Sequence, residues 1–98
     1  MRVLRLPLTI IWSKEATEWV TANRKSRSLI EWIDDEASKL AWEPNPSGVK
    51  RIADPDLRWS EGQTLRVRLG DYRIIYADVS FKGYIVIVRV MSRDKVYN

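Results

Sequence analysis

A short segment in the second half of the chain carries arginines at a regular spacing. Arg66 and Arg68 alternate with apolar residues over positions 65–69, and Arg73 follows the dipeptide Gly70-Asp71 closely. Guanidinium groups are permanent cations that bind phosphate oxygens through paired hydrogen bonds. Gathered in one place, such groups would hold a phosphate and stabilise negative charge that develops on it.

The same segment predicts how its arginines are brought together. Alternation of apolar and polar residues on both sides of Gly70-Asp71 is typical of a β-hairpin with a two-residue turn. That register places Arg68 opposite Arg73 and Arg66 opposite Ile75, with the arginines on one sheet face. Like charges in facing positions destabilise a sheet, which favours an anion-binding role. The alternative is a solvated strand face whose arginines serve solubility.

The N-terminal half supplies two helices. A strand is expected from Val3 to Trp12, and Pro7 within it favours either an edge position or an irregularity at Pro7, because proline cannot donate to a ladder. Ser13 fits the N-cap of a short helix that ends near Asn23. A second helix is expected to open at Ser28, whose spacing to Glu31 fits a capping box. The two helices should form a hairpin packed on a sheet.

The C-terminal half supplies the rest of the sheet. Residues 43–63 carry prolines and glycines without a sustained period and predict a long loop. Residues 84–90 are almost continuously apolar, which predicts a central strand covered on both faces. The expected fold is a single α+β domain over residues 1–98. Its two N-terminal helices pack on a mostly antiparallel sheet of about four strands in the order β-α-α-β-β-β.

Composition limits the chemistry further. The 98 residues contain no Cys and no His, which excludes disulfides, Cys or His metal ligands, and catalysis by a Cys nucleophile or a His base. Residues 1–44 carry 7 basic and 7 acidic side chains, whereas residues 45–98 carry 10 and 6. The excess of +4 therefore belongs to the C-terminal half and favours a polyanionic partner there. Neither a signal peptide nor a transmembrane span is expected, which favours a cytoplasmic location without membrane binding.

Two stretches of the chain resemble the RelE/ParE superfamily of type II toxin–antitoxin toxins, its RelE-like branch above all. One is the G-D-Y-R-I-I-Y sequence of residues 70–76, and the other is the R-x-x-V-Y pattern of residues 93–97. The resemblance implies a ribosome-dependent endoribonuclease that cuts messenger RNA and inhibits translation. ParE-type members are instead implied to poison DNA gyrase without cutting RNA. A relative that only binds its antitoxin and operator DNA is a third possibility.

The resemblance also implies roles for individual residues and for partners. The positions that match the catalytic set are Arg66, Arg68, Arg73, Arg93 and Tyr97, and the basic residues expected at bound RNA are Lys50, Arg51 and Lys95. The implied partners are a cognate acidic antitoxin, messenger RNA in the ribosomal A site and ribosomal RNA. The toxin–antitoxin complex is expected to reach operator DNA through the antitoxin.

These residues suit cleavage of RNA by its own 2′-hydroxyl. That reaction needs no metal, no cofactor and no protein nucleophile, only alignment, proton transfer and stabilisation of an anionic phosphate. Arginine is a poor base, so Tyr97 is the better candidate for proton transfer, as acid at the 5′-oxygen or as base at the 2′-hydroxyl. A frayed terminal residue is the alternative for Tyr97.

Five tryptophans stand out in a chain of this length. Trp12, Trp19 and Trp32 fall on or beside helical stripes and are expected in the core. Trp42 and Trp59 border the long loop. Trp59 is a candidate for stacking a nucleotide or seating an antitoxin residue, with packing of the loop onto the sheet as the alternative.

Overall fold

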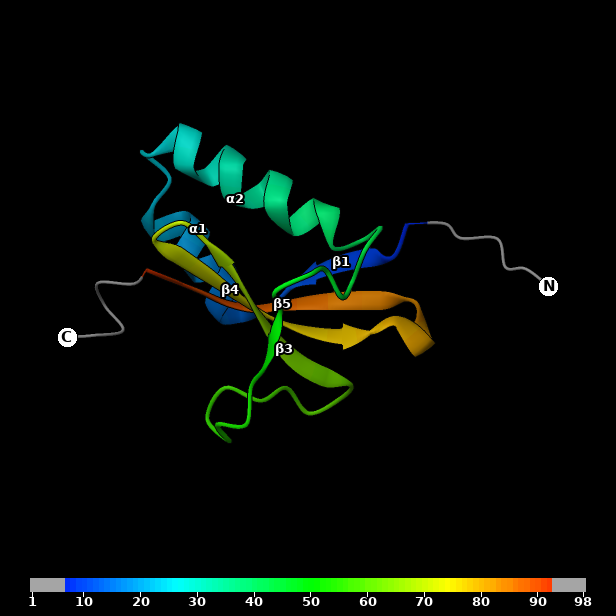
Figure 1. Cartoon of the computed structure of the whole chain (residues 1–98). Coiled ribbons are helices and arrows are strands. Elements are labelled where there is room, and N and C mark those ends of the chain that lie inside the picture. The colour runs from blue at the N-terminus through cyan, green and yellow to red at the C-terminus, as the bar shows by residue number, and fades with distance from the viewer. Residues whose placement is uncertain (1–6, 93–98) are drawn as a thin grey trace.

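The structure is a computed structural model that describes residues 7–92 (Figure 1). Five strands form one sheet in the order β1-β5-β4-β3-β2. The strands are β1 (Thr9–Trp12), β2 (Lys50–Arg51), β3 (Gln63–Leu69), β4 (Tyr72–Val79) and β5 (Tyr84–Ser92). The helices are α1 (Lys14–Ala22), α2 (Arg27–Lys39) and the short 3-10 helix η1 (Ser80–Lys82). β1 runs parallel to β5, and every other pair of neighbours is antiparallel.

The α+β class is confirmed, and the number of strands is corrected from about four to five. The additional strand is β2, whose two residues pair with Arg66 and Leu65 of β3. Two residues within a segment rich in proline and glycine are too few to show an alternating pattern. β2 therefore forms because it pairs with β3, and not because its two residues have a strong strand propensity.

The positions of the outer and inner strands agree with the sequence. β1 lies at one edge of the sheet and β5 lies between β1 and β4. In β5 the run Ile85–Val88 is buried. The sequence predicts that the first strand begins at Val3, and positions 1–6 lie outside the described residues.

The predicted N-cap is found for α1 but not for α2. The Ser13 hydroxyl accepts a hydrogen bond from the Ala16 amide at 3.1 Å, which confirms Ser13 as the N-cap of α1. α2 begins at Arg27 with Ser26 as its N-cap, so the predicted capping box at Ser28 is wrong. The carbonyl of Ser26 already accepts from the Ile30 amide, which places Ser28 inside the first turn.

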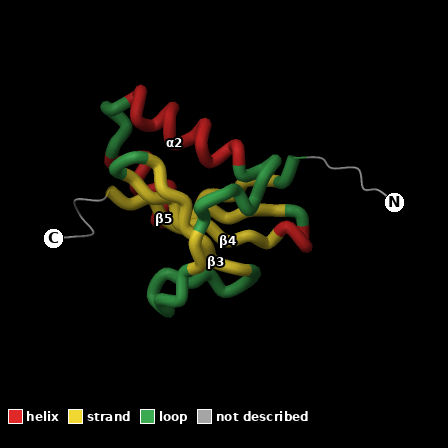
Figure 2. The backbone as a smooth tube through the Cα atoms, viewed as in Figure 1, coloured by secondary structure: helices red, strands yellow, loops and turns green. Residues whose placement is uncertain are grey.

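The main core lies between the helices and one face of the sheet, as Figure 2 shows for the layers. Its buried members are Ala16, Ile33, Ala37, Leu40, Leu65, Ile74, Tyr76, Ile85, Ile87 and Val90. Trp12 and Trp19 pack against this core, as expected. The prediction for Trp32 is wrong, because its side chain is 38% exposed. Its ring lies edge-on to Tyr72, so Trp32 covers the margin of the core.

A second apolar cluster lies on the opposite face of the sheet. Its buried members are Ile75, Ala77, Val79, Val86 and Val88. Ile52 and Trp59 from the long loop pack against it. The loop therefore covers part of this face.

Candidate functional site

The hairpin has the register that the sequence predicts. Arg68 lies opposite Arg73 and Arg66 lies opposite Ile75. Val67 and Leu69 pack against the main core, so the alternate residues Arg66 and Arg68 belong to the face away from the helices. The two strands thus bring three guanidinium-bearing residues to one sheet face.

A fourth cation joins this face from β2. Lys50 pairs with Arg66 in the β2–β3 ladder and therefore shares its face. We call the set Lys50, Arg66, Arg68 and Arg73 the basic face. Lys50 and Arg68 are exposed, whereas Arg66 and Arg73 are half-buried.

Three of the four cations on the basic face have no opposing carboxylate within residues 7–92. Among residues 7–92, no Asp or Glu lies within ion-pair distance of Lys50, Arg66 or Arg68. Arg66 belongs to a row of residues that face one another across the strands, and this row continues through Ile75 of β4 to Arg89 of β5. Nη2 of Arg89 lies 2.5 Å from Oε2 of Glu15. Only the end of the row nearest α1 is therefore neutralised, and the rest can attract an anion.

The remaining expected site residues are not all on the basic face. Arg51 pairs with Leu65, a core residue, so its side chain leaves the strand on the opposite side from Lys50. With the Gln63 amide oriented so that its oxygen faces Arg51, Nη2 of Arg51 donates to that oxygen at 2.6 Å. Arg93, Lys95 and Tyr97 lie outside the described residues.

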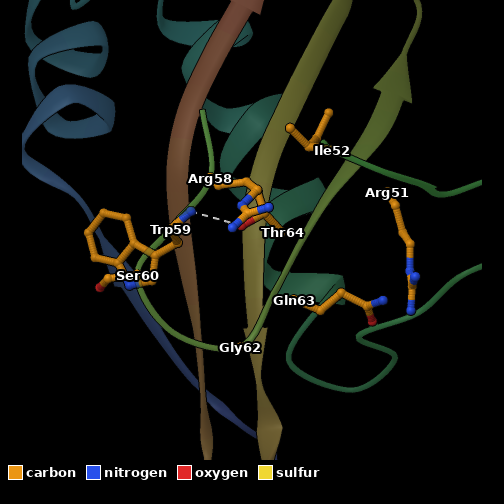
Figure 3. Close-up of a pocket in the computed structure, with 8 residues that line it drawn as sticks. All are labelled: Arg51, Ile52, Arg58, Trp59, Ser60, Gly62, Gln63 and Thr64. Carbon is orange, nitrogen blue, oxygen red and sulfur yellow. Dashed lines mark hydrogen bonds between the residues drawn. The ribbon is translucent and has the colours of Figure 1, made fainter. Parts of the chain in front are cut away.

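A polar pocket lies where the long loop returns to β3 (Figure 3). Its volume is about 580 Å³, and its lining residues are Arg51, Ile52, Arg58, Trp59, Ser60, Gly62, Gln63 and Thr64. The amide of Trp59 donates to the Thr64 hydroxyl at 2.8 Å, which ties the loop to the strand. The lining contains two arginines and no carboxylate, so the pocket continues the positive potential of the basic face.

A polar cluster fastens the far end of the loop. The Glu61 carboxylate accepts hydrogen bonds from Lys82 and from the Tyr84 hydroxyl. The hydrogen bond from Lys82, followed by that from Tyr84, holds the pKa of Glu61 below its ordinary value. The same hydrogen bond raises the pKa of Lys82. The Glu61 carboxylate thus pairs with Lys82 of η1 and Tyr84 of β5, and it does not neutralise the arginines of the pocket.

The near end of the loop is fastened by a buried tyrosine. The Tyr76 hydroxyl donates to the carbonyl of Pro44 at 2.7 Å, and the Tyr76 side chain is fully buried. Burial raises the pKa of Tyr76 well above its ordinary value, so this phenol stays a neutral hydrogen-bond donor. Both ends of the loop are therefore positioned by β4 and β5.

Sequence reasoning missed part of this site. Gln63 and Thr64 are not predicted from the sequence, and Arg58 is noticeable there only as the neighbour of Trp59, because their contribution depends on how the loop folds back on β3. The available signal was the tripeptide Arg58-Trp59-Ser60, in which a cation and an aromatic stand side by side in a loop. Trp59 packs against the second cluster and also lines the pocket.

Two other kinds of site are absent from residues 7–92. None of the helices within residues 7–92 has both the length and the apolar character that crossing a membrane requires. Over the same residues, no three Asp or Glu side chains gather in a group that could hold a metal ion.

Solved structures share this fold. The toxin–antitoxin complex RelBE2 from Mycobacterium tuberculosis contains a chain that matches with a TM-score of 0.67 and 22% identity, covering 90% of this chain and 100% of that one. The archaeal RelE–RelB complex from Pyrococcus horikoshii contains a chain that matches with a TM-score of 0.60 and 22% identity, covering 90% and 97%. At this level of identity the likeness establishes the fold.

The family is established by the sequence itself. Residues 10–97 match the family model described as ParE toxin of type II toxin-antitoxin system, parDE. The chain therefore belongs to the ParE toxin family, within the RelE/ParE superfamily that its hairpin and C-terminal pattern resemble. No curated protein matches the chain.

Proposed function

We propose that this toxin is a metal-independent endoribonuclease that cuts messenger RNA in the ribosomal A site and so inhibits translation. The observation that carries the proposal is the basic face, where four cations from three strands converge and three of them meet no carboxylate among the described residues. This arrangement costs folding stability and suits a polyanionic substrate, here messenger RNA held beside ribosomal RNA.

The chemistry requires little beyond this face. The 2′-oxygen of the RNA attacks the adjacent phosphorus, and the bond from phosphorus to the 5′-oxygen breaks. The 2′-hydroxyl loses its proton and the 5′-oxygen gains one, which leaves a 2′,3′-cyclic phosphate and a 5′-hydroxyl. Arg66, Arg68 and Arg73 stabilise the extra negative charge on the phosphate, as does Arg93 in our proposal. We assign proton transfer to Tyr97 and contact with flanking RNA to Lys50, Arg51 and Lys95.

The experiment uses ribosomes programmed with a defined messenger RNA and an empty A site. The intact chain should release fragments with 5′-hydroxyl ends. Arg73→Ala should reduce cleavage by at least about 100-fold, the scale seen when one oxyanion donor is removed, while its circular dichroism spectrum stays unchanged. Arg27→Ala, which removes an exposed arginine from α2, is the matched control and should cut normally. Equal cleavage by a folded Arg73→Ala protein would overturn the proposal.

The family description favours a second candidate function. Its name refers to the toxin of parDE systems, and the ParE type is implied by the resemblance to poison DNA gyrase. In that case, induced expression would accumulate covalent complexes between gyrase and cut DNA while messenger RNA stays intact. Cut messenger RNA without such complexes would support the endoribonuclease.

We further propose that an acidic antitoxin segment folds onto the basic face and silences it. The two solved complexes named above pair toxins with antitoxins, and uncompensated cations favour carboxylates in such a partner. Binding of the antitoxin to a triple alanine variant of Arg66, Arg68 and Arg93 should weaken and lose much of its salt dependence. Unchanged affinity and salt dependence would place the antitoxin elsewhere. The complex would reach operator DNA through the antitoxin.

A further inference from the structure

The pocket between β2, the loop and β3 is not used by the proposed cleavage chemistry. Its two arginines, one indole and several amide and hydroxyl groups form a lining that suits a nucleotide. Arginine binds phosphate or stacks on a base, and aromatic rings accept any base on their face. A volume of about 580 Å³ lies within the ordinary range of small-ligand pockets.

The pocket is continuous with the basic face along one strand. Thr64 lines the pocket, and Arg66 and Arg68 follow it on the same face of β3 at two-residue steps. Each step advances about 7 Å along a strand. A single-stranded RNA whose phosphate lies at Arg68 can therefore run along β3 and reach the pocket with a neighbouring nucleotide.

The side chains of the pocket are arranged around its opening. Figure 3 draws the Trp59 indole and the Arg51 guanidinium at opposite sides, with Arg58 and Thr64 between them. Arg58 is exposed, and no carboxylate among residues 7–92 lies within ion-pair distance of it. The backbone amide of Arg58 donates to the Asp54 carbonyl, which fixes the backbone at this position. The exposed guanidinium is accessible to a ligand.

We propose that this pocket binds one nucleotide of the RNA that flanks the scissile phosphate, with its phosphate on Arg58 and its base against the exposed part of Trp59. The proposal rests on the proposed function for the identity of the polyanion. Arg58 is a positioning residue in this account, because it holds the substrate away from the reacting atoms.

The test separates the pocket from the catalytic chemistry by measuring binding and cleavage independently. The binding probe is a fluorescent eight-nucleotide RNA with 2′-O-methyl groups throughout, which cannot be cut, at low ionic strength. Arg58→Ala should weaken its binding by at least about 10-fold, the loss expected for one charged hydrogen-bonded contact. The control Arg27→Ala removes the same charge from the helical side and should change binding less than 2-fold.

Cleavage on ribosomes gives the second readout. Arg58→Ala should raise KM for messenger RNA with kcat nearly unchanged, and it should alter which nucleotides flank the cut. Arg58→Lys should restore part of the binding, because the charge returns without the paired hydrogen bonds. A photoreactive 5-bromouracil in the probe should crosslink to the peptide that contains Trp59.

The outcomes distinguish the two proposals. Selective loss of probe binding in Arg58→Ala supports the pocket even where the parent protein cuts no messenger RNA, a result that would overturn only the endoribonuclease. Cleavage and probe binding that are equal in Arg58→Ala and the parent would overturn the pocket and leave the endoribonuclease standing. A parent protein that does not bind the probe would also overturn the pocket. Loss of affinity confined to an Asp- and Glu-rich peptide would assign the pocket to an acidic protein partner and overturn the nucleotide.

Discussion

Replacement of Arg68 by glutamine should make the protein more stable and less active at the same time. Arg68 and Arg73 face each other directly across the β3–β4 ladder, and Arg66 lies on the same face. A like-charge pair in facing positions costs about 0.2–1 kcal/mol relative to a neutral pair. Arg68→Gln removes the repulsion, retains a long polar side chain and leaves the backbone ladder intact.

The size and salt dependence of the gain follow from this geometry. A gain of about 0.2–1 kcal/mol corresponds to a rise in Tm of about 1–8 °C for a domain of this length. Arg68 is exposed, so its repulsion is screened by salt. The Debye length falls from about 10 Å at 0.1 M to about 3 Å at 1 M salt. The gain should therefore shrink as salt is added.

The assay is urea unfolding of the parent protein and Arg68→Gln at 0.05 M and 1 M NaCl, with ribosomal cleavage measured on the same samples. Arg27→Gln is the control, because this exposed helical arginine faces no cation across a ladder. It should change the free energy of unfolding by less than about 0.5 kcal/mol. Destabilisation by Arg68→Gln, or a gain that salt does not reduce, would refute the idea that function places these arginines together at the expense of stability.

Three further changes test how the loop is held. Tyr76→Phe should lower the free energy of unfolding by about 1–2 kcal/mol in urea unfolding, because the Pro44 carbonyl loses its buried donor; an unchanged value would show that this bond is not formed in solution. Gly62→Ala should lower the free energy of unfolding by more than about 2 kcal/mol in the same assay, since Gly62 has φ +73° and a Cβ there would lie 2.3 Å from the Asp78 carbonyl oxygen. An unchanged free energy of unfolding would contradict this backbone. The Glu61 carboxylate has a lowered pKa in the folded protein, so its contribution is present above its ordinary pKa of 4.5 and is lost as pH falls through the lowered value. Thermal unfolding of parent and Glu61→Gln should therefore converge at acidic pH, and a constant difference between them would contradict the lowered pKa.

The hairpin and the central strand could be predicted because their information is local. Alternation around Gly70-Asp71 fixes which residues face each other, and a one-residue slip would turn Leu65 away from the core. The buried run at Ile85–Val88 likewise indicates a strand covered on both sides.

Two features depend on contacts between distant segments and could not be predicted. β2 exists because Lys50 and Arg51 pair with β3, and the same pairing turns these two adjacent cations to opposite sides. Ile75 and Ala77 belong to a buried cluster against which Ile52 and Trp59 of the loop pack, although the register alone places them on the face of the arginines. The alternation in β3 predicts which residues lie on each face of the strand. It does not predict which part of the arginine-bearing face the loop covers.

Attack by the RNA 2′-hydroxyl can be tested with a messenger RNA that carries one 2′-deoxy nucleotide at the position that the parent protein cuts on the ribosome. The all-ribose message should be cleaved strongly, with a 5′-hydroxyl end. No cleavage is expected at the substituted position, because the 2′-oxygen is the nucleophile. Cleavage at the deoxy position, or an uncut ribose message together with gyrase–DNA complexes in cells, would overturn the endoribonuclease mechanism.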